Sequence, residues 1–165
     1  MIKVLFVCMG NICRSPTAEA VFRHQTKTSQ LKNSIIVDSA GTHSYHIGEP
    51  SDQRAQKIAK LHGYDMKNIR ARQFNTSDFI SFQYILAMDK HNFDMLEKIC
   101  PPQYNHKLEM LMQYSKNYPE YEEVPDPYFG GQQGFEEVLK LIEDASTGLL
   151  KKINDTHNKR NVQKY

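Results

Sequence analysis

Apolar residues along this chain follow two periods that alternate from the first residues to about residue 149. Short runs of consecutive apolar or β-branched residues are typical of strands buried on both faces, and apolar residues three and four positions apart are typical of helices. The first pattern predicts strands at residues 2–7, 34–39, 82–88 and 106–112. The second predicts helices at residues 15–26, 51–62, 90–100 and 135–149.

Strands that alternate with helices pair in parallel, because each helix carries the chain back across one face of the sheet. We therefore expect an α/β fold, a single-domain three-layer α/β/α sandwich with a central four-stranded parallel sheet and helices on both faces. Ligands of such sheets bind beyond the carboxyl ends of the strands. Cys8 follows the first predicted strand and the irregular segment 114–134 follows the fourth, so both are expected at that edge.

The ends of the predicted helices carry residues suited to those positions. Pro16 fits a first helical turn, where no N–H is needed, and Asp89 can cap the helix that follows it. Gly63 closes the second helix, and Pro101 and Pro102 stop the third.

Composition narrows the class of protein. The 165 residues are 39% apolar and 24% charged with a net charge of +2, which fits one folded domain and gives no reason to expect nucleic-acid binding. No apolar run approaches the ~18 residues that span a bilayer, so no membrane association is expected. The opening run is too short for a signal peptide, which predicts a cytoplasmic protein, although export without a cleavable signal stays open. Residues 1–155 are the predicted domain, and 156–165 a basic, flexible tail.

Cysteines and histidines exclude two kinds of site. The chain has three cysteines, Cys8, Cys13 and Cys100, an odd number that argues against a disulfide framework. His43 and His46 have no third ligand at a suitable spacing, so we expect no metal. We expect no cofactor and a monomer.

The turn "VCMGNICRSP" carries the clearest chemistry. A loop that enters a helix presents free main-chain N–H groups and the positive end of the helix dipole, which together bind anions. Gly10 permits close approach, and the Arg14 guanidinium matches two phosphate oxygens. The same surroundings favour Cys8 as a thiolate, which could attack phosphorus and form a phosphocysteine.

The spacing Cys-x5-Arg is weak evidence alone, but here it lies between a buried strand and a Ser-Pro helix start. A nucleotide P-loop fails, because its two glycines are absent and Arg14 replaces its lysine. A phosphatase also needs an acid for the leaving oxygen, and "VPDPY" offers Asp126 within a long loop of the kind that is often functional. Standing alone, Asp126 would be read as a turn residue.

With these residues in view, nearly the whole chain resembles the low-molecular-weight protein tyrosine phosphatases. The matching segments are "VCMGNICRSPTAEAVFR", "SAGTHSYHIGEPSDQRA", "FQYILAMDKHN" and "VPDPYFGG…GFEEVL". The family fold, a four-stranded parallel sheet, agrees with the pattern above. The resemblance implies a protein tyrosine phosphatase that acts through a phosphocysteine intermediate.

The resemblance also implies residue roles. Cys8 matches the nucleophile, and Arg14 the phosphate-binding arginine. Asp126 matches the general acid, which then serves as base for the hydrolytic water. The main-chain N–H groups of the loop match the phosphate cradle, which comprises Met9, Gly10, Asn11, Ile12, Cys13 and Arg14.

Three loop residues keep a second interpretation. Asn11 matches the asparagine that supports the strained loop, but could be an ordinary loop residue. Ser15 matches a serine that donates to the thiolate, but could simply cap the helix. Cys13 matches a cysteine that forms a protective disulfide with an oxidised Cys8, but could be small buried packing.

The family resemblance also implies a substrate class. Tyr45 and Tyr128 resemble aromatic walls that stack on a phenyl ring, although Tyr45 could be a plain exposed loop residue. Ile12 occupies a position where arginine phosphatases of the family tend to have threonine, which favours phosphotyrosine. The expected partners are therefore phosphotyrosine proteins or peptides, with inorganic phosphate and other oxyanions as inhibitors.

Three alternatives remain. A protein arginine phosphatase is disfavoured by Ile12. An arsenate reductase of the same fold needs two further cysteines, and Cys100 is the only cysteine outside the loop. A non-catalytic phosphotyrosine-binding module would retain Cys8, Arg14 and Asp126 together for no visible reason.

Overall fold

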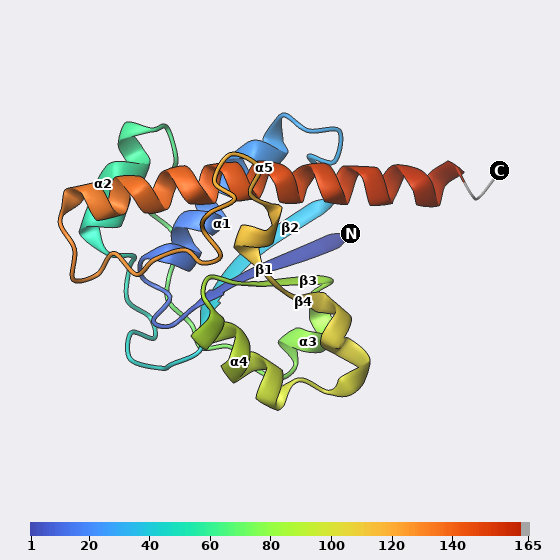
Figure 1. Cartoon of the computed structure of the whole chain (residues 1–165), viewed down its shortest axis with the longest axis horizontal. Coiled ribbons are helices and arrows are strands. Elements are labelled where there is room, and N and C mark those ends of the chain that lie inside the picture. Colours follow the sequence, from blue (N-terminus) through green and yellow to red (C-terminus); the bar gives the residue numbers. More distant parts are fainter. Residues whose placement is uncertain (163–165) are drawn as a thin grey trace.

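The computed structural model describes residues 1–162 and forms a four-stranded parallel sheet with helices on both faces, which confirms the expected fold class (Figure 1). The strand order is β2 (Ile35–Gly41), β1 (Ile2–Cys8), β3 (Tyr84–Ala87) and β4 (Leu108–Met110). One face is covered by α1 (Arg14–Lys27) and α5 (Gln132–Val162), with α2 (Gln53–Leu61) packed on α5. The other face is covered by α3 (Asp78–Ser81) and α4 (Lys90–Ile99).

Strand β1 explains why the first apolar run is continuous. Its side chains alternate between two cores, so every position from Val4 to Cys8 is buried on one face or the other. Val4 and Phe6 pack into the larger core on the α1 and α5 side. Leu5 and Val7 pack into the smaller core on the α3 and α4 side. The sheet thus fixes Cys8 at the carboxyl end of a central strand, with neighbours on both sides.

The predicted helix signals are borne out. The Asp89 side chain accepts a hydrogen bond from the Asn92 N–H and caps α4. Gly63 follows α2 with a φ of 84°, the left-handed conformation for which glycine is suited. Helix α2 begins two residues later than expected, because the Asp52 side chain caps it by accepting from the Arg54 N–H.

Other features differ from the expectations. Helix α3 and the 3₁₀ turns η1 (Pro102–Lys107) and η2 (Leu111–Tyr114) were not anticipated, since they are too short to show a period. Helix α5 runs through residues 156–162, the part of the expected flexible tail that the structure describes; residues 163–165 lie outside it. None of the described helices, α5 included, has an apolar stretch long enough to cross a membrane.

Candidate active site

Three carbonyl groups at the loop between β1 and α1 accept from main-chain N–H groups of neighbouring segments. The Cys8 carbonyl accepts from the Thr42 N–H at 2.8 Å, and the Met9 carbonyl from the His43 N–H at 3.0 Å. The Ile12 carbonyl accepts from the Asp52 N–H at 2.8 Å. Within residues 1–162, no protein group accepts from the main-chain N–H groups of Met9, Gly10, Asn11, Ile12 and Cys13. The loop is therefore a ring of available donors at a helix N-terminus, an anion-binding arrangement.

Asn11 holds this loop in a strained conformation. Its φ of 57° lies in the left-handed region, where a non-glycine residue needs local compensation. Its buried side chain provides that compensation by accepting from the Arg72 N–H at 2.9 Å and donating to Ser15 and Ser39. Gly41 lies directly beneath the loop, where an added Cβ would stand 2.6 Å from the Met9 carbonyl oxygen.

Arg14, the first residue of α1, is fixed by acceptors from distant segments. Its side chain is 3% exposed and donates to Asp89 Oδ2 at 2.6 Å and to the Val124 carbonyl at 3.1 Å. Burial alone would disfavour its charge, but Cys8, Asp89 and Asp126 raise the pKa of Arg14 above its ordinary value. Asp89 thus both caps α4 and orients the guanidinium.

The two loop cysteines lie in different surroundings. Cys8 Sγ is 3.0 Å from Ser15 Oγ at the floor of the pocket. Cys13 is buried, and this burial, with the nearby negative charges of Asp52, Cys8 and Asp126, raises the pKa of its thiol well above the ordinary range. Cys13 therefore stays a neutral thiol at neutral pH. Both thiols are free.

Asp126 stands across the pocket from the loop. Its half-exposed carboxylate lies 3.6 Å from Arg14 and accepts from the Tyr128 N–H at 3.0 Å. The segment is tied to α2 by Arg54, which donates to the Tyr128 carbonyl at 2.9 Å. The Arg54 guanidinium also lies 4.7 Å from the centre of the Phe135 ring and pairs with the Asp52 carboxylate. The main-chain N–H of Asp52 in turn donates to the Ile12 carbonyl of the loop.

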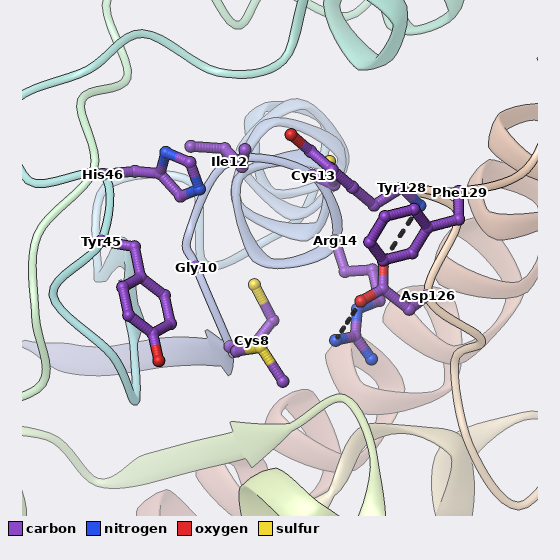
Figure 2. Close-up of a pocket in the computed structure, with 11 residues that line it drawn as sticks. Cys8, Gly10, Ile12, Cys13, Arg14, Tyr45, His46, Asp126, Tyr128 and Phe129 are labelled. Carbon is purple, nitrogen blue, oxygen red and sulfur yellow. Dashed lines mark hydrogen bonds and ion pairs between the residues drawn. The ribbon is translucent and has the colours of Figure 1, made fainter.

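The pocket opens between two aromatic sides (Figure 2). Tyr45 and His46 form one side, and Tyr128 and Phe129 form the other, with Cys8 and Arg14 between them. The Tyr45 ring stacks on His43 with centroids 5.1 Å apart. A slot with a donor ring at its base and flat apolar walls fits a phosphate carried on a planar group.

A family model described as low molecular weight phosphotyrosine protein phosphatase matches residues 3–159. The chain belongs to this family. A Streptomyces coelicolor low molecular weight protein-tyrosine-phosphatase is 41% identical over 155 residues, covering 93% of this chain and 94% of that protein. The crystal structure of an Entamoeba histolytica protein tyrosine phosphatase superposes with a TM-score of 0.91 at 43% identity, covering 95% of this chain and 99% of that one. A Drosophila arginine phosphatase superposes at 0.83 with 35% identity, covering 92% and 98%.

The fold brings the catalytic, phosphate-binding and substrate-binding residues expected from the sequence to one pocket or to the loop that forms its base. The pocket is lined by Cys8, Met9, Gly10, Ile12, Cys13, Arg14, Tyr45, Asp126 and Tyr128. Asn11 and Ser15 lie behind the loop, and Ser15 bonds Cys8 rather than capping α1.

Sequence reasoning missed several residues around this pocket. They are His46 and Phe129 on the rim, Asp89 behind Arg14, Arg54 behind Tyr128, and Ser39 and Arg72 behind Asn11. Asp89 had been singled out only as a helix cap. His46 is considered in the sequence only as a possible metal ligand. The remaining residues give no signal, because each acts through a contact that only the folded chain creates.

Proposed function

We propose that the chain is a protein tyrosine phosphatase that hydrolyses phosphotyrosine through a phosphocysteine on Cys8. The observation that carries the proposal is the position of the Cys8 thiol at the base of a ring of main-chain donors, with Arg14 beside it and Asp126 opposite. A phosphate in this ring would lie directly above the sulphur. Other oxyanions fit the same donors, so inorganic phosphate should inhibit by competition.

The first step transfers the phosphoryl group to sulphur. The Cys8 thiolate attacks phosphorus and forms the S–P bond while the bond from phosphorus to the phenolic oxygen breaks. Asp126, in its protonated form, donates a proton to that oxygen, so tyrosine leaves neutral. Arg14 and the loop N–H groups bind the negative charge that builds on the phosphoryl oxygens.

The second step returns the enzyme to its starting state. Asp126, now a carboxylate, takes a proton from a water molecule whose oxygen attacks phosphorus. The S–P bond breaks, phosphate leaves, and the thiolate is restored with Ser15 beside it. Cys13, being a neutral thiol at neutral pH, does not compete as a nucleophile.

The rim supports phosphotyrosine as the substrate. Tyr45 and Tyr128 face each other across a slot that suits a phenyl ring, and Ile12 adds an apolar side chain to the loop. A phosphoserine would be too short to place its phosphate in the ring while its backbone clears the rim.

The test compares phosphotyrosine and phosphoarginine peptides with the wild type, Cys8→Ser and Asp126→Ala. We expect phosphotyrosine turnover that Cys8→Ser abolishes and Asp126→Ala lowers by about 10²–10⁴-fold. Preference for phosphoarginine, the substrate class named for the Drosophila relative, would refute the substrate assignment and leave the cysteine chemistry standing. If the wild type binds phosphate and turns over neither peptide, the enzyme assignment is wrong.

A further inference from the structure

A buried carboxylate on α1 has no task in the proposed reaction. Glu19 is only 4% exposed, next to Ala18 and Ala20, which are also buried. One of its oxygens accepts from Ser39 Oγ at 2.5 Å, and the other pairs with Arg23. Burial raises the pKa of the Glu19 carboxyl, and the bonds from Ser39 and Arg23 oppose that effect. Burying a carboxylate costs free energy even when the group is paired, so a role for Glu19 beyond packing is expected.

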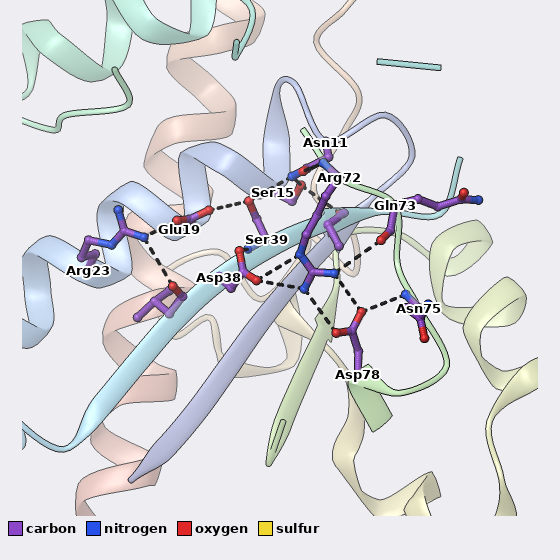
Figure 3. Close-up of polar contacts among 12 residues, drawn as sticks. Asn11, Ser15, Glu19, Arg23, Asp38, Ser39, Arg72, Gln73, Asn75 and Asp78 are labelled. Carbon is purple, nitrogen blue, oxygen red and sulfur yellow. Dashed lines mark hydrogen bonds and ion pairs between the residues drawn. The ribbon is translucent and has the colours of Figure 1, made fainter. Parts of the chain in front are cut away.

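Glu19 is the first member of a continuous chain of hydrogen bonds that ends on the Cys8 sulphur. Figure 3 shows the part of this chain that runs from Glu19 through Ser39 and Asn11 to Ser15. Ser39 Oγ lies 2.9 Å from Asn11 Nδ2. The same nitrogen lies 2.8 Å from Ser15 Oγ. Ser15 Oγ in turn lies 3.0 Å from Cys8 Sγ. Each of these contacts is buried, so water does not offer the groups other partners.

With Glu19 ionised, as its ion pair with Arg23 favours, these hydrogen bonds have only one direction. A carboxylate can only accept, so the Ser39 hydroxyl must give its single proton to Glu19. Its oxygen is then an acceptor for Asn11. The Asn11 amide oxygen is already taken by the Arg72 N–H, so its NH₂ group is the part that faces the two serines.

The direction carries through to the sulphur. Ser15 Oγ accepts from Asn11, which leaves its own proton for Cys8 Sγ at 3.0 Å or the Ala40 carbonyl at 3.3 Å. A thiolate is the stronger acceptor because it is charged. Chains of this kind also polarise their members, so a charge at one end strengthens the bond at the other.

We propose that Glu19 is a positioning residue. Its charge takes the Ser39 proton and so keeps the Ser39 oxygen an acceptor for Asn11, which holds the Asn11 amide where it leaves Ser15 to donate to the Cys8 thiolate. The inference rests on the proposed function, since it concerns the same thiolate. Glu19 acts through Ser39 and touches no substrate.

A direct charge effect would have the opposite sign, which makes the proposal testable. Removing a nearby negative charge relieves repulsion and favours the thiolate. Breaking the chain takes a donor from the thiolate and favours the thiol. Arg23 and Asp38 are the charged groups that face Glu19; Arg14, Cys13 and Asp126 face Cys8.

The experiment measures iodoacetate alkylation of Cys8 against pH, with the modified peptide quantified by mass spectrometry. Glu19→Gln keeps the shape of the side chain and removes its charge. We expect the midpoint of the pH–rate profile to move upward by about half a unit to one unit. Ser39→Ala should move it in the same direction, and the double variant no further than Ser39→Ala alone.

A matched control is Asp38→Asn, which removes a neighbouring carboxylate that pairs with the Arg72 side chain and makes none of the hydrogen bonds between Glu19 and Cys8. Its amide oxygen can still accept from the Ser39 N–H, as Asp38 does at 2.8 Å. We expect no upward movement. An unchanged or lowered midpoint in Glu19→Gln, additive effects in the double variant, or an equal rise in Asp38→Asn would each overturn the proposal.

The test separates this inference from the proposed function. Alkylation requires no turnover, so a wild type that hydrolyses no phosphoester would refute the function and still allow the variants to be compared. If Glu19→Gln does not fold, Ser39→Ala interrupts the same chain without altering any charge, and an unmoved midpoint in that variant overturns the proposal by itself.

Discussion

Gly41→Ala should damage the phosphate cradle from beneath. Gly41 ends β2 and pairs with Cys8 in the sheet register. An alanine Cβ would stand 2.6 Å from the Met9 carbonyl oxygen and 3.2 Å from the Asn11 nitrogen. Both are main-chain atoms, which cannot rotate aside as a side chain could. Gly41 is itself held from behind, since its N–H donates to the Arg72 carbonyl at 2.9 Å.

The size of the effect follows from this distance. An ordinary contact requires the Met9 carbonyl oxygen and the new Cβ to separate by about 0.8 Å more. Overpacking of this kind costs about 1–3 kcal/mol, which for a chain of this length lowers the melting temperature by about 2–12 °C. A displacement near 1 Å in a catalytic loop costs on the order of 10²-fold in rate. We therefore expect kcat/KM to fall on that scale and phosphate to inhibit more weakly.

Gly148→Ala is the matched control, because its clash lies away from the pocket. Its Cβ would stand 2.0 Å from the Tyr114 carbonyl oxygen, where α5 packs on η2. We expect lower stability with the activity of the folded protein retained. Thermal melts, steady-state kinetics and phosphate inhibition of both variants decide the matter. Wild-type kinetics in Gly41→Ala would refute the view that this glycine shapes the cradle.

Three further perturbations test separate parts of the account. Asn11→Gly and Asn11→Ala both remove the bonds to Ser15, Ser39 and Arg72, but only the alanine variant must hold a Cβ-bearing residue at a φ near 57°. Urea unfolding should therefore show Asn11→Ala less stable than Asn11→Gly by about 1 kcal/mol, and equal stabilities would contradict backbone strain at this position. In the Cys8→Ser variant, burial keeps Cys13 a neutral thiol. Iodoacetamide should therefore leave Cys13 unmodified at pH values near ~8.5, where a solvent-exposed cysteine reacts, and rapid labelling of Cys13 would contradict its raised pKa. Burial opposes the ionisation of Asp144, but hydrogen bonds donated by Ser115, Asn117 and Lys116 lower its pKa. The stability that the ionised Asp144 contributes is therefore present above the pKa of ~3.9 in the unfolded chain and is lost as pH falls below that value. Asp144→Asn should lower the urea unfolding midpoint at pH 7 more than at about pH 3, and an equal fall at both pH values would contradict this.

The fold was largely accessible from the sequence, because its signals are local. The unbroken apolar run of β1 reflects cores on both faces, and Pro16, Gly63 and Asp89 mark helix ends through their own conformations or side chains. The extension of α5 through residues 156–162 was not accessible, since that polar segment lacks the apolar period used to find helices.

The central residues of the site could be predicted from the sequence, whereas the residues that position them could not. The spacing of Cys8 and Arg14 within a strand–loop–helix turn is a local signal. The contact between Arg14 and Asp89 joins residues 75 positions apart, and that between Arg54 and Tyr128 joins residues 74 apart. Such pairs depend on how the elements pack, which no local pattern of one sequence specifies.

The central claim is that Cys8 carries the phosphoryl group during turnover, and trapping that intermediate tests it most directly. Wild-type protein would be mixed rapidly with a phosphotyrosine peptide, quenched within one turnover, digested and mapped by mass spectrometry, with Cys8→Ser as the control. The account predicts a phosphoryl group on Cys8 in the wild type and on no residue of the variant. Turnover with the phosphoryl group on another side chain, or with no phosphoenzyme at any quench time, would contradict it.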